Sequence, residues 1–318
     1  MQILQDYNLS EISHYRIGGK ARYYIEIENE NDLLFLPQII NEKKCKYMVI
    51  GDTTNILFDD KGYDGMIIKI SCKKIEYDDK QADDTTVMAE VDAGVSMNYL
   101  ALEAANKGLS GLEWAGGLPG TLGGAIRGNA GCFKGETKDN IIEVKSFDIE
   151  KGVFVTRNSR ECEFGYRTSI FKTESINEII WSAKISLTRS DTNGVIELTQ
   201  QRVQYRLNNH PMEYPSLGST FKNVPVNEFR QEVLEENGLV ELIKDDPFPI
   251  IPTGILIDRS GLKGYKVGGA EISIKHANFL VNTGGATSED VEAVIKHVKD
   301  AVKEKFGVGL QVEIMIVK

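Results

Sequence analysis

The sequence predicts an α+β fold with strand-rich and helical segments and no internal repeat. Three observations support this class: a β-α-β pattern in the first 70 residues, alternating apolar strands between residues 71 and 185, and an amphipathic helix near the end. A chain of 318 residues is long enough for two or three domains. The expected domains are residues 1–70, 71–205 and 206–318. For the last strand two placements are left open, in the third domain or back in the first.

The first domain is expected to contain three strands and one helix. The strands are predicted at Ala21–Ile27, Tyr47–Ile50 and Gly65–Ile70, where apolar residues dominate. The helix is predicted over Asn31–Lys43. Pro37 lies in its middle and is expected to kink or split it, because proline has no amide hydrogen to donate.

The middle of the chain is expected to form an antiparallel sheet with one clear helix. The helix is predicted over Met97–Asn106, with Ser96 as its N-cap and Gly108 as its stop. The strands with alternating apolar residues are predicted at Ile142–Ile149, Gly152–Thr156 and Glu178–Thr188.

The C-terminal part begins with a polar helix over residues 190–210 that ends at Pro211. A second helix is predicted between Thr287, its N-cap, and Gly307, its stop, because six apolar residues recur on one face. A final strand is predicted at Val308–Val317. It places Glu313 on the face opposite to Val308, Leu310, Val312, Ile314 and Ile316.

Composition excludes several classes of protein. A net charge of −10 argues against a protein that binds the nucleic-acid backbone, which needs a basic face. No apolar run reaches the length of a membrane span and the N-terminus has no signal-like stretch, so a cytoplasmic protein is expected. The four cysteines and four histidines show no spacing of a metal site, so free thiols and no zinc are expected.

Glycine is most concentrated in a glycine-rich run, residues 108–135, which contains ten glycines. Glycine costs conformational entropy, so such a run indicates sharp turns or a close approach to a ligand. The run lacks both G-x-G-x-x-G after a strand and G-K-[ST], which excludes the common dinucleotide and nucleotide loops. Two interpretations stay open: a loop whose amides surround a phosphorylated cofactor, and a structural crossover between sheets.

Other candidates are weaker when taken one at a time. The turn V-I-G-D-T-T-N-I-L after the 47–50 strand could hold a diphosphate or be an ordinary β-turn. Arg167 could pair with a carboxylate or be solvated on an edge strand, and Ser219 could donate a proton or be structural. Glu313 lies either at a solvated edge or in a cleft, where burial would raise its pKa. His276 is more typical of a hydrogen-bonded side chain than of a ligand contact.

In their order along the chain, these motifs together resemble one family, the UDP-N-acetylenolpyruvoylglucosamine reductases (MurB) of peptidoglycan synthesis. The resemblance extends from Y-R-I-G-G at residues 15–19 to Glu313. The motifs that carry it are G-x-x-x-N-I-L, G-L-E-W-A-G-G-L-P-G-T-L-G-G-A, N-A-G, F-G-Y-R-T-S-I-F, Y-P-S-L-G-S-T-F-K-N, I-D-R-S-G-L-K-G, V-G-G-A-E-I-S-I-K-H-A-N-F and K-E-K-F-G-V-G-L-Q-V-E. The short link before Tyr214 resembles the subtype without an extra tyrosine-bearing loop.

The resemblance implies two FAD-binding subdomains of the vanillyl-alcohol-oxidase (PCMH) type, followed by an α+β substrate-binding domain. It implies non-covalent FAD, NADPH as the electron donor, and UDP-N-acetylglucosamine enolpyruvate as the substrate, with no nucleic acid or membrane as partner. The positions that match the family's flavin loops are Gly51, Asp52, Thr53, Thr54, Asn55, Ile56, Pro119, Gly120, Thr121, Gly123, Gly124, Asn129 and Gly131.

The resemblance also implies roles for individual side chains. Arg167 and Glu313 would polarise the substrate's carboxylate, and Ser219 would protonate its α-carbon. The positions that match the family's substrate contacts are Tyr166, Lys222, Asn223 and His276.

One departure from the family pattern concerns the first flavin loop, where G-x-G-S-N is replaced by G-D-T-T-N. Thr53 is β-branched and is not expected to adopt a positive φ, so the loop is expected to differ or to keep a negative φ there. Asp52 also brings negative charge toward a diphosphate. This leaves two alternatives: a differently specific flavin enzyme such as an oxidase, and a non-catalytic relative that binds FAD or a nucleotide sugar.

Overall fold

The computed structural model describes residues 1–78, 85–175, 177–246 and 248–318. These residues form two compact units of mixed helix and strand content, which confirms the α+β class. Unit 1 consists of Met1–Tyr7, Ala21–Asp52 and Asp64–Arg206, and unit 2 of Asn8–Lys20, Thr53–Tyr63 and Leu207–Lys318. The division into 1–70, 71–205 and 206–318 stays a prediction; two segments of the first 70 residues group with the C-terminal part.

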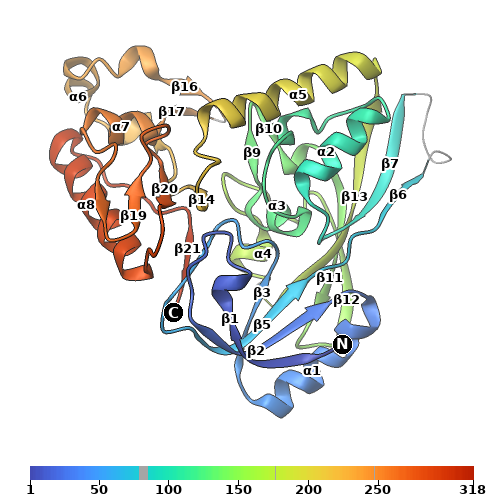
Figure 1. The fold of residues 1–318 in the computed structure, drawn as a ribbon. Helices are drawn as coiled ribbons and strands as arrows, with labels where there is room; N and C mark the ends of the chain where they lie inside the picture. Colours follow the sequence, from blue (N-terminus) through green and yellow to red (C-terminus); the bar gives the residue numbers. More distant parts are fainter. Residues whose placement is uncertain (79–84, 176, 247) are drawn as a thin grey trace. The chain divides into compact units, whose positions relative to one another are not determined.

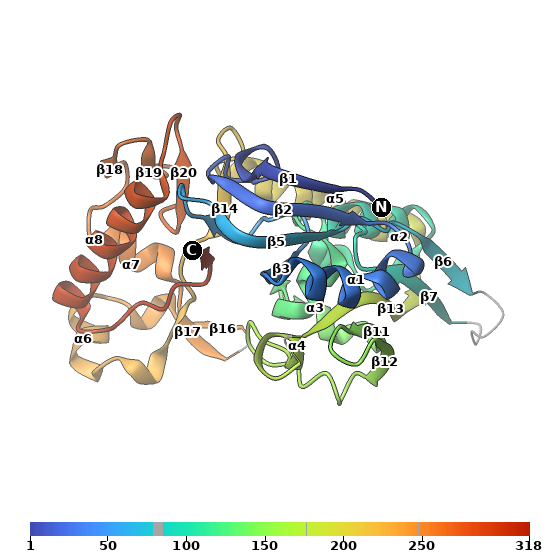
Figure 2. The same cartoon turned by 90° about the horizontal axis from the view of Figure 1, so that it is seen from below.

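The first sheet of unit 1 carries one helix. Its strand order is β1 (Ile3–Asn8), β2 (Lys20–Ile27), β5 (Tyr63–Ile70), β3 (Lys46–Ile50), with β3 and β5 parallel. Helix α1 (Glu30–Lys43) lies beside this sheet (Figures 1 and 2). Leu33 and Leu36 of α1 are fully buried in the same core as Met66 of β5.

The sequence predicts that Pro37 kinks or splits α1, and the split is wrong, because the helix runs unbroken through Pro37. Proline removes one backbone hydrogen bond from a helix interior. The burial of two leucines in the adjoining turn offsets this cost, since each fully buried leucine contributes about 1.5–3 kcal/mol.

The second sheet of unit 1 is antiparallel, as expected. Its order is β12 (Val153–Asn158), β11 (Ile141–Asp148), β13 (Glu178–Arg189), β7 (Thr86–Asp92), β6 (Ile75–Asp78), and β8 (Leu109–Ser110) also pairs with β13. Helices α2 (Met97–Asn106) and α3 (Leu122–Gly128) contribute buried side chains to its core, and α5 (Thr192–Asn209) follows β13 (Figure 1). Ser96 caps α2 by accepting a hydrogen bond from the Tyr99 amide, as predicted.

Short elements connect these parts of unit 1. They are the 3₁₀ turns η2 (Glu113–Ala115) and η3 (Thr137–Asp139), the hairpin of β9 (Gly131–Cys132) and β10 (Gly135–Glu136), and α4 (Ile170–Thr173). Phe133 and Lys134 both have positive φ at the tip of the hairpin, which is typical of a type I′ turn.

Unit 2 contains three small sheets. The largest has the order β14 (Ser216–Ser219), β20 (Phe279–Asn282), β19 (Ala270–Ile272), β18 (Lys266–Val267). The second is β15 (Val224–Pro225), β17 (Pro249–Ile251), β16 (Lys244–Asp245), and the third pairs β21 (Met315–Val317) in parallel with β4 (Ile56–Phe58). The last strand therefore pairs with a strand from the first 70 residues.

Helices α6 (Gln231–Glu236), α7 (Thr253–Arg259) and α8 (Ser288–Phe306) complete unit 2. The prediction for α8 is confirmed at both ends: Thr287 and Asp290 form a capping box, and Gly307 has a φ of 74°. Asp60 adds a second cap, since its carboxylate accepts from the Ser288 amide and hydroxyl. The apolar face of α8 packs on β18 and β19. None of the helices among the described residues is long and apolar enough to cross a bilayer.

The predicted ten-residue final strand is wrong in its extent, since only Met315–Val317 forms a strand. Val308, Leu310 and Ile314 are buried as the alternation requires, but Ile316 is half-buried and Val317 is buried instead. The alternation breaks because the segment changes partner: Val312 bridges Phe221, whereas residues 315–317 pair with β4.

Candidate active site

The two predicted flavin loops begin side by side in unit 1. Gly51 follows β3 directly, and a Cβ atom built on it would lie 2.4 Å from Thr121 Oγ1. A larger residue at position 51 would therefore have to move the Thr121 side chain, whose Oγ1 caps α3. Glycine permits this close contact between the two loops.

The second loop runs into α3 in an extended conformation. The Leu122 and Gly123 amides donate to the carbonyls of Val95 and Ala93, both at 2.8 Å. Thr121 caps the helix by accepting from the Gly124 amide at 3.3 Å. Gly120 has a φ of 103°, which only glycine adopts readily.

The backbone of this loop fits an anionic cofactor. Within the described part of the chain, the amides of Gly120 and Thr121 have no hydrogen-bond acceptor. Pro119, just before them, is exposed. Backbone amides of a loop that have no acceptor in the protein can donate hydrogen bonds to the oxygens of a diphosphate. The residues present therefore fit FAD at this loop.

Thr53 corrects the expectation about the first loop, because it adopts a φ of +55°. Its side chain is buried, with 4% exposed. Thr53 Oγ1 accepts from the His14 amide and donates to the Ile12 carbonyl, both at 2.9 Å. These two bonds hold a β-branched residue in a conformation that costs roughly 1–2 kcal/mol. Asp52, the preceding residue, is exposed.

In unit 2, Ser219 ends β14 at an irregular position in its pairing. Ser216 pairs with Val281 and Ser219 with Phe279, and the extra residue between them is accommodated by Gly218 at a φ of 72°. The buried Asn278 side chain stabilises the turn that follows. Its Oδ1 accepts from the Phe221 amide at 3.0 Å, and its Nδ2 donates to the Phe221 carbonyl at 2.8 Å.

Glu313 lies next to this turn. Its amide donates to the Thr220 carbonyl at 2.8 Å, so the backbones of the two segments run antiparallel here. The Glu313 carbonyl accepts from Asn55 Nδ2 at 3.2 Å, and the Met315 amide donates to the Asn55 carbonyl. Unit 2 therefore brings the segments of Ser219, Glu313 and the first flavin loop together, with the Glu313 side chain half-buried.

The three predicted substrate contacts of unit 2 meet around the start of α7. Thr253 Oγ1 donates to the Lys222 carbonyl at 2.5 Å, and its amide donates to Asn223 Oδ1 at 3.2 Å. The next residue, Gly254, faces His276: a Cβ built there would lie 3.3 Å from His276 Cε1.

Burial lowers the pKa of His276 below its ordinary value, and the charges of Lys263 and Lys244 add to this shift. His276 Nδ1 accepts from the Asn278 amide at 3.3 Å, which requires that this nitrogen carry no proton. The imidazole is therefore neutral near pH 7, with its other nitrogen available as a donor.

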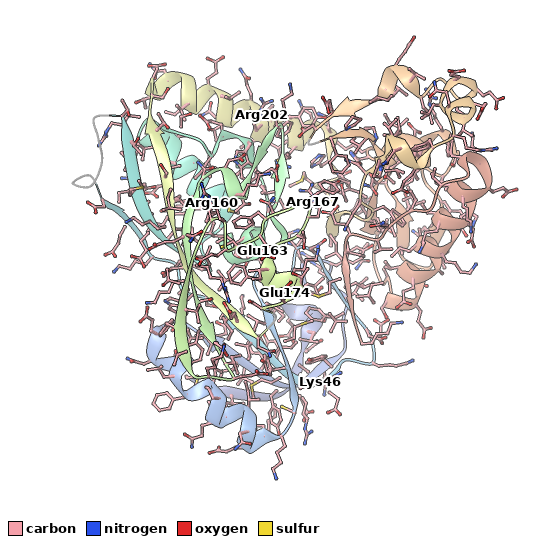
Figure 3. The ribbon with its side chains drawn as sticks, turned by 180° about the vertical axis from the view of Figure 1, so that it is seen from behind. Lys46, Arg160, Glu163, Arg167, Glu174 and Arg202 are labelled. Carbon is pink, nitrogen blue, oxygen red and sulfur yellow. The ribbon has the colours of Figure 1, made fainter. Side chains whose placement is uncertain are left out.

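Arg167 lies in unit 1, in a tight turn between Gly165 and Thr168. The Gly165 amide donates to the Thr168 carbonyl at 3.1 Å, and the Thr168 amide donates back to Gly165 at 3.3 Å. Arg167 has a φ of 57°, and its guanidinium lies 5.5 Å from the centre of the Tyr166 ring. Figure 3 labels Arg167 on this turn.

The predicted residues are thus distributed over both units. Arg167 and the glycine-rich loop belong to unit 1, whereas Ser219, Glu313, Lys222, Asn223 and His276 belong to unit 2. Sequence reasoning missed Asn278, which bonds the backbone of Thr220 and Phe221 just after Ser219, and Thr253, which bonds the Lys222 carbonyl. Asn278 follows His276 in the motif K-H-A-N-F, and this was the available signal.

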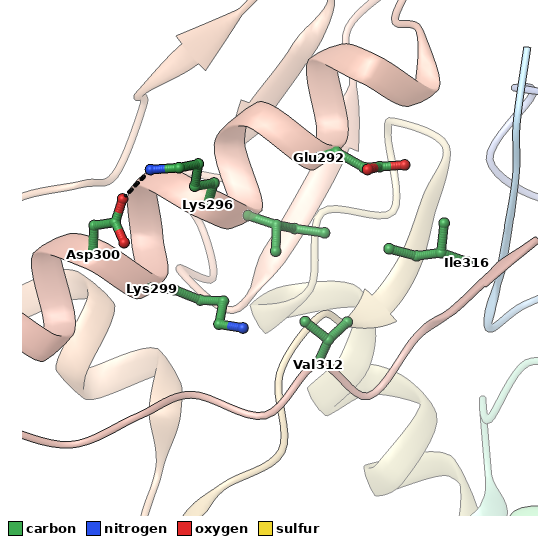
Figure 4. Close-up of a pocket in the computed structure, with 7 residues that line it drawn as sticks. Glu292, Lys296, Lys299, Asp300, Val312 and Ile316 are labelled. Atoms are coloured by element: carbon green, nitrogen blue, oxygen red, sulfur yellow. Dashed lines mark hydrogen bonds and ion pairs between the residues drawn. The ribbon is translucent and has the colours of Figure 1, made fainter.

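A separate groove of about 360 Å³ lies between α8 and the 312–316 segment of unit 2 (Figure 4). Three apolar residues, Ile295, Val312 and Ile316, line it together with charged residues that include the Lys296–Asp300 ion pair. None of the predicted site residues lines this groove.

Family models match most of the chain. A model described as FAD binding domain matches residues 21–157, and one described as UDP-N-acetylenolpyruvoylglucosamine reductase, C-terminal domain, matches residues 210–317. The crystal structure of MurB from Thermus caldophilus superposes with a TM-score of 0.75 at 27% identity and covers 100% of this chain and 98% of its own.

Curated relatives extend the match over nearly the full length. A UDP-N-acetylenolpyruvoylglucosamine reductase from Fervidobacterium nodosum is 36% identical over 310 residues, which are 98% of this chain and 90% of the relative. The corresponding protein from Caldicellulosiruptor saccharolyticus is 34% identical over 99% of this chain and 91% of its own length. Identity at this level and coverage establishes the family, and the chain belongs to the UDP-N-acetylenolpyruvoylglucosamine reductases.

Proposed function

We propose that this chain is a cytoplasmic, NADPH-dependent flavoenzyme that reduces UDP-N-acetylglucosamine enolpyruvate to UDP-N-acetylmuramate in peptidoglycan precursor synthesis. The observation that carries the proposal lies in unit 2, where the Glu313 amide bonds the carbonyl of Thr220, the neighbour of Ser219. The segments that carry an acid and a hydroxyl, Glu313 and Ser219, are thereby held side by side, although they lie far apart in the sequence. This adjacency supports a shared role in one reaction.

FAD would be held without a covalent bond by the loops that begin at Gly51 and Pro119. The tight approach of Gly51 to Thr121 and the available amides of Gly120 and Thr121 support this assignment. When bound, FAD would carry reducing equivalents from NADPH to the vinyl group of the substrate. The α3 N-terminus adds a favourable field for the diphosphate.

Arg167 and Glu313 would bind the carboxylate of the enolpyruvyl group. Reduction at the terminal vinyl carbon places negative charge on the α-carbon and on this carboxylate. A guanidinium stabilises that charge directly, and a protonated carboxylic acid can donate a hydrogen bond to it. The pKa of Glu313 is therefore predicted to be raised in the substrate complex.

Ser219 would donate its hydroxyl proton to the α-carbon. A serine hydroxyl is a weak acid, so this step requires a strongly basic carbanion and a donor held in place. The two bonds between Asn278 and Phe221, and the bond from the Glu313 amide to the Thr220 carbonyl, support that positioning. Lys222, Asn223, His276 and Tyr166 are assigned to the UDP-sugar, where Lys222 would offset diphosphate charge.

The test begins with the absorption spectrum of the purified protein, which should show bound flavin that NADPH bleaches. Addition of the enolpyruvyl substrate should restore the oxidised spectrum. Ser219→Ala should slow this second half-reaction by roughly 10²–10⁴-fold and leave flavin reduction by NADPH intact. Ser216→Ala, on the same strand, is the matched control and should behave as wild type.

Two results would contradict the proposal. A colourless protein that cannot be reconstituted with FAD would support the non-catalytic alternative. Normal turnover of the Ser219→Ala variant would remove Ser219 as the proton donor.

A further inference from the structure

The turn that presents Arg167 is bonded at both ends to the last turn of α3. Upstream of Arg167, the Gly165 carbonyl accepts from Asn129 Nδ2 at 3.0 Å. Downstream, Ser169 Oγ donates to the Arg127 carbonyl at 2.8 Å. The arginine turn and the glycine-rich loop are therefore connected within unit 1, although 36 residues separate Asn129 from Gly165.

Asn129 holds the two segments together, and both polar atoms of its side-chain amide form hydrogen bonds; we call this arrangement the clamp. Besides Gly165, its Nδ2 donates to the Glu136 carboxylate at 2.5 Å, and its Oδ1 accepts from the Lys138 amide at 3.1 Å. Two acceptors and one donor surround the amide, so only one orientation satisfies all three. Asn129 is 1% exposed and has a φ of 42°, a conformation that asparagine tolerates better than most residues.

The acceptor Glu136 is itself held in place. Its side chain and that of Asp139 form a capping box on η3, and Lys138 Nζ lies 3.0 Å from its carboxylate. Within the turn, Lys172 Nζ donates to the Arg167 carbonyl at 2.8 Å. Glu136, which accepts from Asn129, is therefore fixed by its own contacts. The backbone of Arg167 is restrained separately by Lys172.

We propose that Asn129 is a positioning residue for Arg167, acting through the Gly165 carbonyl rather than by touching a ligand with its own amide. The inference rests on the proposed function, since it takes Arg167 as the group that binds the substrate's carboxylate. A guanidinium stabilises developing charge only in the right orientation, and a displacement of about 1 Å can cost about 10²-fold in rate. Asn129 ties that orientation to the loop assigned to FAD.

The test uses Asn129→Gly, because glycine keeps the positive φ and removes only the side chain. Because Asn129 belongs to the loop assigned to FAD, flavin content and the rate of reduction by NADPH are measured first, and every later rate is referred to the FAD-loaded variant. Its reoxidation by the enolpyruvyl substrate should be slower by roughly 10–100-fold, in kcat rather than KM. In an Arg167→Ala background, Asn129→Gly should have no further effect, since the two residues act as one unit.

A second measurement does not depend on turnover. Trypsin should cleave after Arg167 faster in Asn129→Gly than in wild type, because the turn loses its anchor. The matched control is Asn140→Ala, which removes another buried asparagine whose Nδ2 donates to a backbone carbonyl, that of Ser186. It should change neither the cleavage after Arg167 nor the rate of reoxidation.

The outcomes separate the two proposals. Wild-type protein that never reduces the enolpyruvyl compound refutes the proposed function, and the cleavage experiment still decides whether Asn129 holds the turn. An unchanged cleavage pattern in Asn129→Gly, or an equal loss of rate in the Arg167→Ala background, overturns the clamp.

Discussion

Thr53 Oγ1 accepts a hydrogen bond from the His14 amide at 2.9 Å and donates one to the Ile12 carbonyl at the same distance. The hydroxyl thus satisfies two backbone groups of a neighbouring segment in unit 2. It does so from a left-handed conformation at a position where the family pattern has glycine. The two hydrogen bonds offset the strain of the positive φ, so Thr53 preserves the turn that glycine forms in the family pattern.

Thr53→Val should lower the free energy of unfolding by about 1–3 kcal/mol. Valine keeps the β-branched shape and the strain but leaves the His14 amide and the Ile12 carbonyl without partners. Thr53→Ser retains the hydroxyl and is the matched control. Urea unfolding followed by circular dichroism measures the difference, and a valine variant as stable as wild type would show that the two bonds contribute nothing.

Arg206→Met should destabilise unit 1 by about 2–4 kcal/mol. The guanidinium is buried and donates to the carbonyls of Gly116 and Trp114 at 2.9 and 3.3 Å, and to Cys132 Sγ at 2.9 Å. Methionine fills much of the volume but leaves the buried Gly116 carbonyl without this donor, whereas the Trp114 carbonyl keeps only the weak donor Cys132 Sγ.

Arg202→Met, one turn earlier on α5, is the control for loss of a positive charge. Arg202 lies over the Phe133 ring at 4.6 Å, and loss of this contact should cost at most about 1 kcal/mol. Equal loss of stability in the two variants would mean that the carbonyl bonds of Arg206 do not matter. Figure 3 labels Arg202 on its helix.

Much of the fold could be predicted from local patterns. The alternation of apolar residues predicted β11 and β13, and the N-cap and stop residues predicted α2 and α8. These patterns depend only on residues within or next to one helix or strand. Pro37 and the final strand were misjudged for the opposite reason. Whether α1 continues depends on the burial of Leu33 and Leu36, and where the last strand begins depends on a change of partner from Phe221 to β4.

The candidate site shows the same division. The residue types at 167, 219 and 313 could be chosen from motifs, but the hydrogen bonds that hold their segments could not, even where a motif contains the residue that makes them. Asn129, Thr253 and Asn278 act through backbone carbonyls and amides of segments tens of residues away, and no spacing along the chain encodes such bonds. Thr53 shows a further limit, since its φ is decided by partners at residues 12 and 14 rather than by its own preference.

Cys72 and Cys162 should resist thiol reagents in the folded protein. Burial raises the pKa of both thiols to about 11, so the thiolate fraction at pH 8 is roughly 10²-fold below that of an ordinary cysteine. Both should react once the protein is unfolded in urea. Alkylation at pH 8 followed by peptide mass analysis tests this, and rapid native labelling of either residue would contradict the burial.

The stability of unit 2 should fall as the pH drops below about 6.5, in part through His276. Its pKa in the folded protein lies below that of the unfolded chain, which is near 6.5. Between these two values the unfolded chain binds more protons, so folding becomes less favourable as the pH falls and is unaffected above the unfolded pKa. Burial is the main cause of the lowered pKa, and the positive charges of Lys263 and Lys244 reinforce it, while the His210 ring packs against the imidazole at 5.6 Å. His276→Gln should remove this part of the pH dependence, measured as the difference between the two unfolding profiles from pH 7.5 to 5. An NMR titration midpoint for His276 at or above 6.5 would refute the lowered pKa of its imidazole.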